Sequence, residues 1–324
     1  NIAITNGSQS AFFFLFNMFS GTFSQPGKEP LKKTVVFPLV PEYVGYADQG
    51  IEKDTFVGIP AKCVYYPDNT FKYFIDFDAL ETYLEKHREV GAMCVSRPTN
   101  PTGNVLTNDE IRHLSALAYK YNIPLFVDNA YGLPFPNIIF TEDAKPYWDS
   151  SVILSMSLSK IGLPSLRTGI VVAKPELIKA LASVNSIVAL ASGSLGQVIS
   201  QDLFATGKMK TLAESYVRPF YQQKSLFAQS CFKEFFAGTN YSVHKSEGAI
   251  FNWILMNDLK IPTKELYVKL KDQGVITVPG EYFFFGTPEH EHYDKCLRIN
   301  YSRPEDEVRE GIRIIAETYK KFCK

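Results

Sequence analysis

The sequence has neither paired cysteine motifs nor an excess of charge of one sign. The cysteines include no Cys-x-x-Cys pair, so neither a disulfide framework nor a zinc site is predicted; they are Cys63, Cys94, Cys231, Cys296 and Cys323. Neither sign of charge is in excess, because Lys plus Arg and Asp plus Glu both number 34. This balance argues against nucleic acid or another polyanion as the partner.

We also find no apolar run long enough to cross a bilayer and no recognisable leader peptide. The apolar run 11–19 is too short to cross a bilayer, and it contains Asn17. No signal peptide, internal repeat or low-complexity tract can be recognised. We therefore expect no membrane segment, and the scattered cysteines predict a cytoplasmic protein.

One short pattern, His290-Glu291-His292, raises the question of a metal. Two histidines at this spacing supply too few ligands for a metal centre. The surrounding loop, which contains proline and glutamate, is typical of a segment exposed to solvent. We therefore predict no metal site.

What the chain does have is a large apolar fraction. Hydrophobic residues make up 45% and aromatic residues 14% of the 324 residues. This is enough for one large α/β domain and a smaller one. Apolar runs that indicate buried strands recur at 34–40, 92–96, 124–128, 152–156 and 168–173.

The C-terminal part has a different sequence pattern, with short hairpin-like strands and separate helices. This pattern predicts a smaller α+β layer. Its expected hairpin-like strands lie at 249–255, 275–278 and 296–300, and its expected helices at 263–273 and 304–322. A long helix at about 210–236 precedes them, with a kink or break expected at Pro219. We place the domain boundary within that helix, which gives a large domain at 1–225 and a small domain at 226–324.

The segment from Ser157 to Arg167 carries the strongest chemical signal. It follows the apolar strand 152–156, and two hydroxyls precede Lys160. A lysine held at a strand end can have its pKa lowered and then form a Schiff base. The hydroxyls and Arg167 are groups that bind a phosphate, and lysine beside a phosphate cup is what pyridoxal phosphate requires. The alternative is a surface lysine and arginine in a turn.

A second candidate phosphate site lies at the start of the chain. The strand 2–5 is followed by Asn6-Gly7-Ser8-Gln9 and a helix from Ser10 to about Phe19. The free N–H groups at a helix N-terminus attract an anion, and a glycine lets the backbone approach it. The alternative is an ordinary turn in which the serine caps the helix.

Polar or aromatic residues also follow three other predicted strands. Asn100 lies in a rigid loop of two prolines and a glycine at a strand end, where open α/β sheets bind ligands. Asp128 ends a strand that looks buried on both faces, so its carboxylate needs a cation such as a protonated pyridine nitrogen. Tyr131 can reach the same ligand, and Asp128 as a turn cap is the alternative. Tyr43 can stack on a flat ring or belong to the core.

Arg298 lies in a predicted strand with apolar neighbours. A guanidinium there needs an anionic partner or exposure to solvent.

Three motifs in order, Asn-Pro-Thr-Gly at 100–103, Asp-x-Ala-Tyr at 128–131 and Ser-x-x-Lys at 157–160, resemble the class I/II aminotransferases. These are pyridoxal-phosphate enzymes of fold type I, and the resemblance covers essentially the whole chain. It implies a mostly parallel central sheet in the large domain, a homodimer, and amino acid and 2-oxo acid substrates. The longer strings 5–13, 96–105, 128–132 and 156–160 are most similar to members that act on valine and pyruvate.

The resemblance also implies a role for each candidate residue. Lys160, Asp128 and Tyr131 would be catalytic: Lys160 would bind the cofactor and move the substrate's α-proton, and Asp128 would keep the pyridine nitrogen protonated. Asn100 and Tyr131 would bind the ring hydroxyl, and Tyr43 would stack on the ring. The phosphate would be held by Gly7, Ser8, Gln9, Ser157 and Arg167. Arg298, with Asn100, would bind the substrate carboxylate.

The implied reaction is transamination of L-valine and pyruvate to 3-methyl-2-oxobutanoate and L-alanine. The alternatives are a carbon–sulfur lyase, an aminotransferase of other specificity, or the ligand-sensing domain of a pyridoxal-phosphate-dependent transcriptional regulator. The family also supplies a tyrosine and a small-domain segment from residues that we expect to precede Asn1. Arg97 is a weak candidate for a second carboxylate clamp, because its proline-flanked loop favours a structural role.

Overall fold

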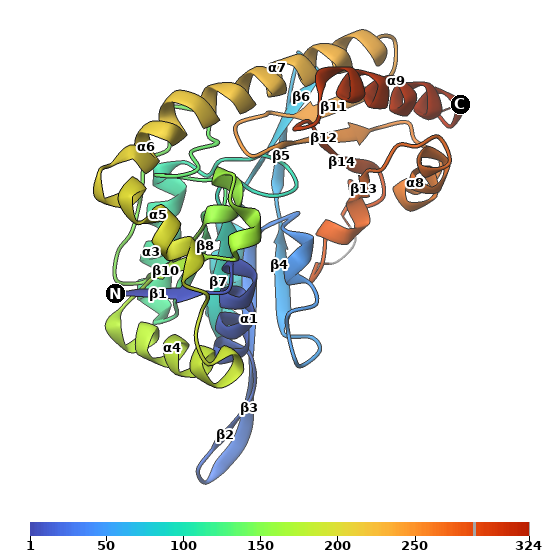
Figure 1. Cartoon of the computed structure of the whole chain (residues 1–324). Coiled ribbons are helices and arrows are strands. Elements are labelled where there is room, and N and C mark those ends of the chain that lie inside the picture. The colour runs from blue at the N-terminus through green and yellow to red at the C-terminus, as the bar shows by residue number, and fades with distance from the viewer. Residues whose placement is uncertain (288–289, 324) are drawn as a thin grey trace.

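The computed structural model describes residues 1–287 and 290–323, and its strands form two separate sheets (Figure 1). The first sheet has eight strands in the described residues. Its order is β1 (Ile2–Thr5), β10 (Gly169–Val172), β9 (Val152–Ser157), β8 (Leu125–Asp128), β7 (Val90–Ser96), β3 (Lys28–Val40) and β2 (Gly21–Gln25), with β4 (Phe56–Pro60) also paired to β3. The pairs β4–β3, β3–β7, β7–β8 and β8–β9 are parallel. The mostly parallel central sheet is therefore confirmed.

The centre of this sheet explains why the predicted strands read as continuous apolar runs. Every residue of β7 and β8 is buried, as expected for parallel strands covered on both faces. The register pairs Ser96 with Asp128 and Asp128 with Ser155. The carboxyl ends of these three strands therefore lie at one edge of the sheet, and so do the polar residues that follow them.

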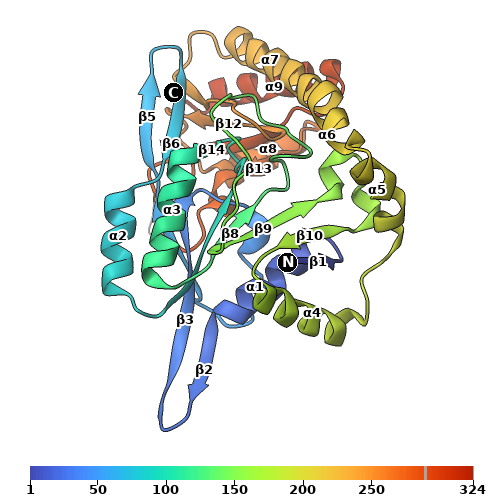
Figure 2. The ribbon, with the colours of Figure 1, turned by 90° about the vertical axis from the view of Figure 1, so that its left-hand side faces the viewer.

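Helices cover both faces of the first sheet (Figure 2). They are α1 (Ser8–Phe19), α2 (Phe77–Lys86), α3 (Asn108–Tyr121), α4 (Pro175–Ala189), α5 (Leu195–Ala205) and α6 (Lys208–Leu212). α3 packs on β8, whereas α1 packs on β3, β9 and β10. A capping box of Thr107 and Glu110 begins α3.

The second sheet lies beside the first (Figure 1), and part of it packs on a separate apolar core while the rest joins the core of the first sheet. Its order is β13 (Val278–Pro279), β14 (Cys296–Asn300), β12 (Phe251–Met256), β11 (Tyr241–His244), β6 (Thr70–Phe74) and β5 (Lys62–Tyr66). The helices α7 (Arg218–Phe235), α8 (Thr263–Lys271) and α9 (Glu305–Lys321) accompany it, and α7 packs on α9. The domain division at 225/226 stays a prediction, and this sheet draws strands from both sides of it.

Two helical details differ from the sequence expectation. The segment Leu195–Ala205 forms α5, a helix that the sequence does not predict. The long helix expected at 210–236 is α6 followed by a π-helical turn, η4 (Ala213–Val217), and then α7. Pro219 has no N–H to donate to the preceding turn, so the wider turn just before it accommodates the missing bond.

The remaining short helices lie near the carboxyl edge of the first sheet or beside the second sheet. They are η1 (Val44–Tyr46), η2 (Leu158–Ile161), η3 (Pro164–Leu166) and η5 (Gly280–Phe283). The hairpin of β2 and β3 projects from the body of the molecule (Figures 1 and 2). In the part of the chain that is described, no helix is both long enough and apolar enough to cross a membrane.

Candidate active site

A cavity of about 500 Å³ lies at the carboxyl edge of the first sheet, where β14 and the start of β12 close it from the second sheet. The residues predicted from the sequence that line it are Ser8, Gln9, Tyr43, Asn100, Asp128, Tyr131, Ser157, Lys160, Arg167 and Arg298. Gly7, the remaining one, contacts Arg167. The two sheets therefore bring together side chains that lie up to 290 positions apart.

Asp128 ends β8, and its carboxylate is bound on both oxygens. The Tyr46 hydroxyl donates to Oδ2 at 2.6 Å, and the Ala130 amide donates to Oδ1 at 2.9 Å. Burial raises the pKa of Asp128, and these two hydrogen bonds oppose the rise. No ion pair with Asp128 forms among the described residues. A cationic nitrogen bound in the cavity would supply the missing charge.

Lys160 lies in η2, immediately after β9, and faces the same cavity. Its Nζ is 5.3 Å from the centre of the Tyr131 ring. Burial lowers the pKa of Lys160, and the nearby Arg298 guanidinium lowers it further, while Asp128 acts in the opposite direction. This environment favours the neutral amine, which is the nucleophilic form of lysine.

The predicted phosphate cup is assembled from three segments. Arg167 Nη1 donates to Ser159 Oγ at 3.4 Å and to the Pro164 carbonyl at 3.2 Å. Gly7 has φ 88°, and a Cβ there would lie only 2.1 Å from Arg167 Nη2. Because Gly7, the N-cap residue of α1, provides no side-chain cap, the first N–H groups of the helix are available to an anion. The alternative of a serine cap is excluded, since Ser8 Oγ donates instead to the Met156 carbonyl at 3.1 Å.

The other members of the cup have polar contacts of their own. Ser157 Oγ accepts from the Ser159 amide at 3.1 Å, and Gln9 Nε2 donates to the Gly45 carbonyl at 3.0 Å. The first contact is local to the segment after β9, whereas the second holds the loop after β3 against α1.

Asn100 and Arg298 meet across the cavity, although 198 positions separate them. Arg298 Nη1 donates to Asn100 Oδ1 at 2.8 Å. The guanidinium lies 4.4 Å from the Phe251 ring centre and 5.3 Å from that of Phe283. Burial lowers the pKa of Arg298, and no carboxylate among the described residues pairs with it. The arginine is therefore fixed in place with its anionic partner still to be supplied.

The Tyr43 ring forms part of the cavity wall and is held by its neighbours. It packs directly on Gly45, where an added Cβ would lie 2.4 Å from the ring. Its other contact is edge-to-face with Tyr46, with 5.1 Å between ring centres. The same Tyr46 donates to Asp128, so one buried tyrosine supports two predicted site residues.

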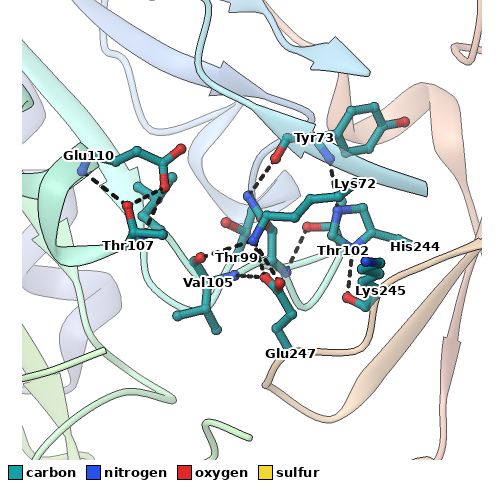
Figure 3. A network of polar contacts seen from close by, with 12 residues as sticks. Lys72, Tyr73, Thr99, Thr102, Val105, Thr107, Glu110, His244, Lys245 and Glu247 are labelled. Carbon is teal, nitrogen blue, oxygen red and sulfur yellow. Dashed lines mark hydrogen bonds and ion pairs between the residues drawn. The ribbon is translucent and has the colours of Figure 1, made fainter. Parts of the chain in front are cut away.

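A buried polar network fastens the loop that carries Asn100 to the second sheet (Figure 3). Lys72 of β6 pairs with both oxygens of Glu247, at 2.7 and 2.5 Å. Glu247 Oε2 also accepts from the Val105 amide at 3.1 Å. We refer to Lys72, Glu247 and Val105 as the clasp. It tethers the loop after β7 to the sheet whose strand β14 carries Arg298.

The structure corrects the prediction that the His290–His292 loop is exposed to solvent. His292 is 2% exposed, and its ring nitrogens lie 2.6 Å from the Tyr73 hydroxyl and 2.7 Å from that of Tyr65. The two tyrosines satisfy the imidazole inside the protein, so it can be buried.

Sequence reasoning missed four residues at this site: Glu42, Tyr46, Ser96 and Phe251. Ser96 begins the string 96–105, whereas Glu42, Tyr46 and Phe251 take part in no recognised motif. The roles of all four depend on which strand ends become neighbours. A faint signal was present for Glu42 and Tyr46, because they flank the Tyr43 loop at a strand end.

The donor set fits pyridoxal phosphate. A buried carboxylate with no ion-pair partner among the described residues matches its ring nitrogen. An amine in an environment that lowers its pKa matches its aldehyde, and an arginine over a helix N-terminus matches its phosphate. Arg298, which pairs with no described carboxylate, matches the carboxylate of an amino acid.

Comparison with known proteins agrees with this arrangement. Residues 53–315 match the family model described as aminotransferase class I and II. The chain is 44% identical over 318 residues to valine–pyruvate aminotransferase of Escherichia coli, covering 98% of this chain and 74% of the relative.

Two solved structures are similar in fold and in sequence. The valine–pyruvate aminotransferase of Salmonella typhimurium matches with a TM-score of 0.90 and 44% identity, over 99% of this chain and 78% of the other. A putative amino-acid aminotransferase from Psychrobacter arcticum matches with a TM-score of 0.95 and 43% identity, over 99% and 75%. The chain therefore belongs to the class I and II aminotransferases.

Proposed function

We propose that this enzyme uses pyridoxal phosphate to transfer the amino group of L-valine to pyruvate, giving 3-methyl-2-oxobutanoate and L-alanine. The observation that carries the proposal is one cavity in which Lys160, Asp128 and Arg298 converge. The 44% identity to a valine–pyruvate aminotransferase supports the choice of substrates.

Pyridoxal phosphate, when bound, supplies an electron sink that stabilises negative charge at the substrate Cα. Asp128 would hold its ring nitrogen, Tyr43 its ring face, and Asn100 and Tyr131 its ring hydroxyl. Its phosphate would be held by Gly7, Ser8, Gln9, Ser157 and Arg167. Lys160 would bind its aldehyde covalently between turnovers.

The protein's own groups perform the proton transfer and the orientation. Lys160 Nζ, once released, takes the proton from the substrate Cα, because its lowered pKa leaves it able to act as a base. Arg298 orients the substrate by a two-pronged pair with the α-carboxylate. Asn100 keeps the guanidinium in position through its bond to Nη1.

The cavity favours a small aliphatic side chain over an acidic one. Val44, Ile250 and Phe251 contribute apolar surface to its wall. Arg97, the candidate for a second carboxylate clamp, is buried and donates to the Leu106 carbonyl at 2.7 Å and to Asn108 Oδ1 at 2.9 Å. Its guanidinium is already used in holding the loop, so Arg298 is left to bind the single carboxylate of valine.

We also propose that the enzyme is a homodimer and that it works in the cytoplasm. Exposed apolar residues gather on α4, α5 and the turn between them, including Ile187, Leu190, Leu195 and Val198. α5 packs close to the phosphate cup, since a Cβ on Gly196 would lie 2.0 Å from Thr168 Oγ1. A second copy covering this face would adjoin the cavity. Sedimentation equilibrium measures the oligomeric state, and a monomer at micromolar concentration would rule the dimer out.

A panel of amino donors tested against pyruvate examines the proposed reaction. Valine should give the higher specificity constant and aspartate the lower, with alanine as the product. A higher value for aspartate would refute the proposed substrate. Release of ammonia together with pyruvate would indicate a carbon–sulfur lyase, and cofactor binding without turnover of any donor would favour a ligand-sensing domain.

A further inference from the structure

Glu42 is a fully buried acid directly behind the cavity, and the chemistry described so far does not use it. Its exposed fraction is 0%. Oε1 accepts from the Ser96 amide at 2.7 Å, and Oε2 accepts from the Tyr43 amide at 2.8 Å. The Ser96 hydroxyl lies 2.9 Å from Oε1 and 2.7 Å from Oε2. Two backbone amides and one hydroxyl therefore converge on one carboxyl group.

No cation accompanies Glu42 in the described residues. The titratable groups that interact with it are Asp128, Tyr46 and Cys94, and none of them is positive. Burial raises the pKa of Glu42 to about 8, with Asp128 adding to the rise and the Ser96 and Tyr43 hydrogen bonds opposing it. The carboxyl is therefore held by hydrogen bonds rather than by an ion pair.

The contacts of Glu42 reach three walls of the cavity. Tyr43 is the next residue and carries the ring that faces the cavity. Ser96 pairs with Asp128 in the sheet and begins the loop to Asn100. The Glu42 amide also donates at 3.0 Å to the carbonyl of Phe283, whose ring lies against the Arg298 guanidinium.

An apolar side chain at this position would fill the space without the desolvation cost of an acid. It would also leave the Ser96 and Tyr43 amides unpaired. A glutamine offers one acceptor oxygen, whereas the two amides bind different oxygens of Glu42. A side chain with a carboxyl group can therefore accept hydrogen bonds from the backbone amides of both loops at once.

We propose that Glu42 is a positioning residue that joins the Tyr43 loop to the Asn100 loop and so sets the spacing between the cofactor's ring face and the substrate carboxylate site. The inference rests on the proposed function of the cavity. Glu42 acts through Tyr43 and Asn100 and touches neither cofactor nor substrate.

The test compares Glu42→Gln with the wild-type holoenzyme by kinetics and by the circular dichroism of bound pyridoxal phosphate. The amide loses at least one of the backbone hydrogen bonds, so the cofactor ring should take a different orientation and change its dichroism. We expect kcat/KM for valine to fall by about tenfold to a hundredfold, the effect of misplacement by about 1 Å. Both kcat and KM should change, because two binding elements shift together.

Asp149→Asn is the matched control. Asp149 is also a carboxyl that accepts from hydroxyls, with Tyr147 at 2.6 Å and Ser151 at 2.7 Å, but it lies outside the cavity. Its variant should keep the kinetic constants and the dichroism of the wild type, even where its melting temperature falls.

Ser96→Ala provides a milder variant should Glu42→Gln fail to fold. It removes only the hydroxyl contacts and should shift the dichroism in the same direction, by less. Wild-type dichroism, kcat and KM in the folded Glu42→Gln or Ser96→Ala variant would overturn the positioning role. Failure of the wild-type protein itself to bind pyridoxal phosphate would instead overturn the proposed function.

Discussion

Two regions of this molecule bury charged side chains, and they treat the charge in opposite ways. In the clasp, Lys72 and Glu247 are 9% and 15% exposed and satisfy each other at 2.5 Å. In the cavity, Lys160, Asp128 and Arg298 are largely buried, yet no ion pair among the described residues includes them. The clasp neutralises its charges internally, whereas the cavity leaves its charges for a ligand.

The difference indicates that the cavity is less favourable to the stability of the folded protein than the clasp, because its charges are arranged for a ligand. A buried charge without a partner destabilises the folded state, and it persists where a ligand supplies the compensation. Hydrogen bonds reduce the unfavourable free energy of burying these charges in the cavity. Tyr46 and Ala130 bind Asp128, and Asn100 binds Arg298. Substitutions in the cavity should therefore change activity most, and substitutions in the clasp should change stability most.

Replacement of Lys160 should have the largest effect. Lys160→Ala removes both the covalent attachment and the base, so transamination should fall by several orders of magnitude. Binding of pyridoxal phosphate should weaken but persist, because the phosphate cup is intact. Borohydride reduction of the wild type followed by mass spectrometry should place the cofactor on Lys160. An adduct on another lysine would remove Lys160 from the mechanism.

Asp128→Asn should reduce turnover far more than cofactor affinity. The neutral amide cannot keep the ring nitrogen protonated, although it still fills the space and can accept from Tyr46. Steady-state kinetics and equilibrium dialysis of the cofactor measure the two effects separately. Turnover of valine at a rate near that of the wild type would show that the carboxylate is not needed for the reaction.

Arg298→Met should raise KM for valine while leaving the apoprotein as stable as the wild type or more so. The methionine removes a buried charge that pairs with no carboxylate in the described part of the chain, and it can pack between Phe251 and Phe283. Arg97→Met is the contrasting variant, since loss of its bonds to Leu106 and Asn108 should lower stability. Equal destabilisation of the two variants, measured by urea unfolding, would contradict the comparison.

In the clasp, Lys72→Met alone should lower the unfolding free energy by about 3–5 kcal/mol, because the Glu247 carboxylate is then buried without the lysine that pairs with it. The double variant with Glu247→Leu should recover a large part of that loss, since neither charge then remains buried. A double-mutant cycle by urea unfolding measures the coupling. A double variant no more stable than Lys72→Met would show that the Val105 contact, rather than the ion pair, dominates the clasp.

The smallest effect concerns pH and distinguishes Glu42 from the paired carboxyls. Its folded-state pKa of about 8 exceeds the ordinary value of 4.5, so between these values the folded state binds one proton more than the unfolded state. Its contribution to the unfolding free energy is therefore present below about pH 4.5 and is lost as pH rises toward 8. Relative to Glu42→Gln, the apoprotein should become less stable as pH rises through that window. Parallel stability curves for the two proteins would refute the assignment.

The sequence was sufficient for the strands of the first sheet and for the residues at their ends. β7, β8 and β9 are short, continuous apolar runs, so their positions and the edge at which Asn100, Asp128 and Lys160 meet could be predicted. The capping box of α3 is equally local. Roles for these residues came from the resemblance, since an apolar run followed by a polar residue indicates a site but not its ligand.

Long-range pairings could not be predicted in the same way. Nothing in the local pattern of Arg298 indicates that Asn100 will be its partner, and nothing near Glu42 indicates Ser96. His292 was expected in solvent because its two tyrosine partners come from β5 and β6, more than 200 positions away. These contacts depend on how the sheets pack, which local periodicity does not encode.

The parallel pairing of β6 with β11 has a consequence for the order in which the protein can fold on the ribosome. Thr70 and Val243 are partners in this pairing, so the β5–β6 hairpin emerges about 170 residues before the strand that continues its sheet. At about 5–20 residues per second, the interval is on the order of ten to thirty seconds. During that time the hairpin has an unpaired edge, and Arg298 has not yet been added to the chain. Nascent chains are therefore unable to assemble the proposed substrate carboxylate site until translation has passed Arg298.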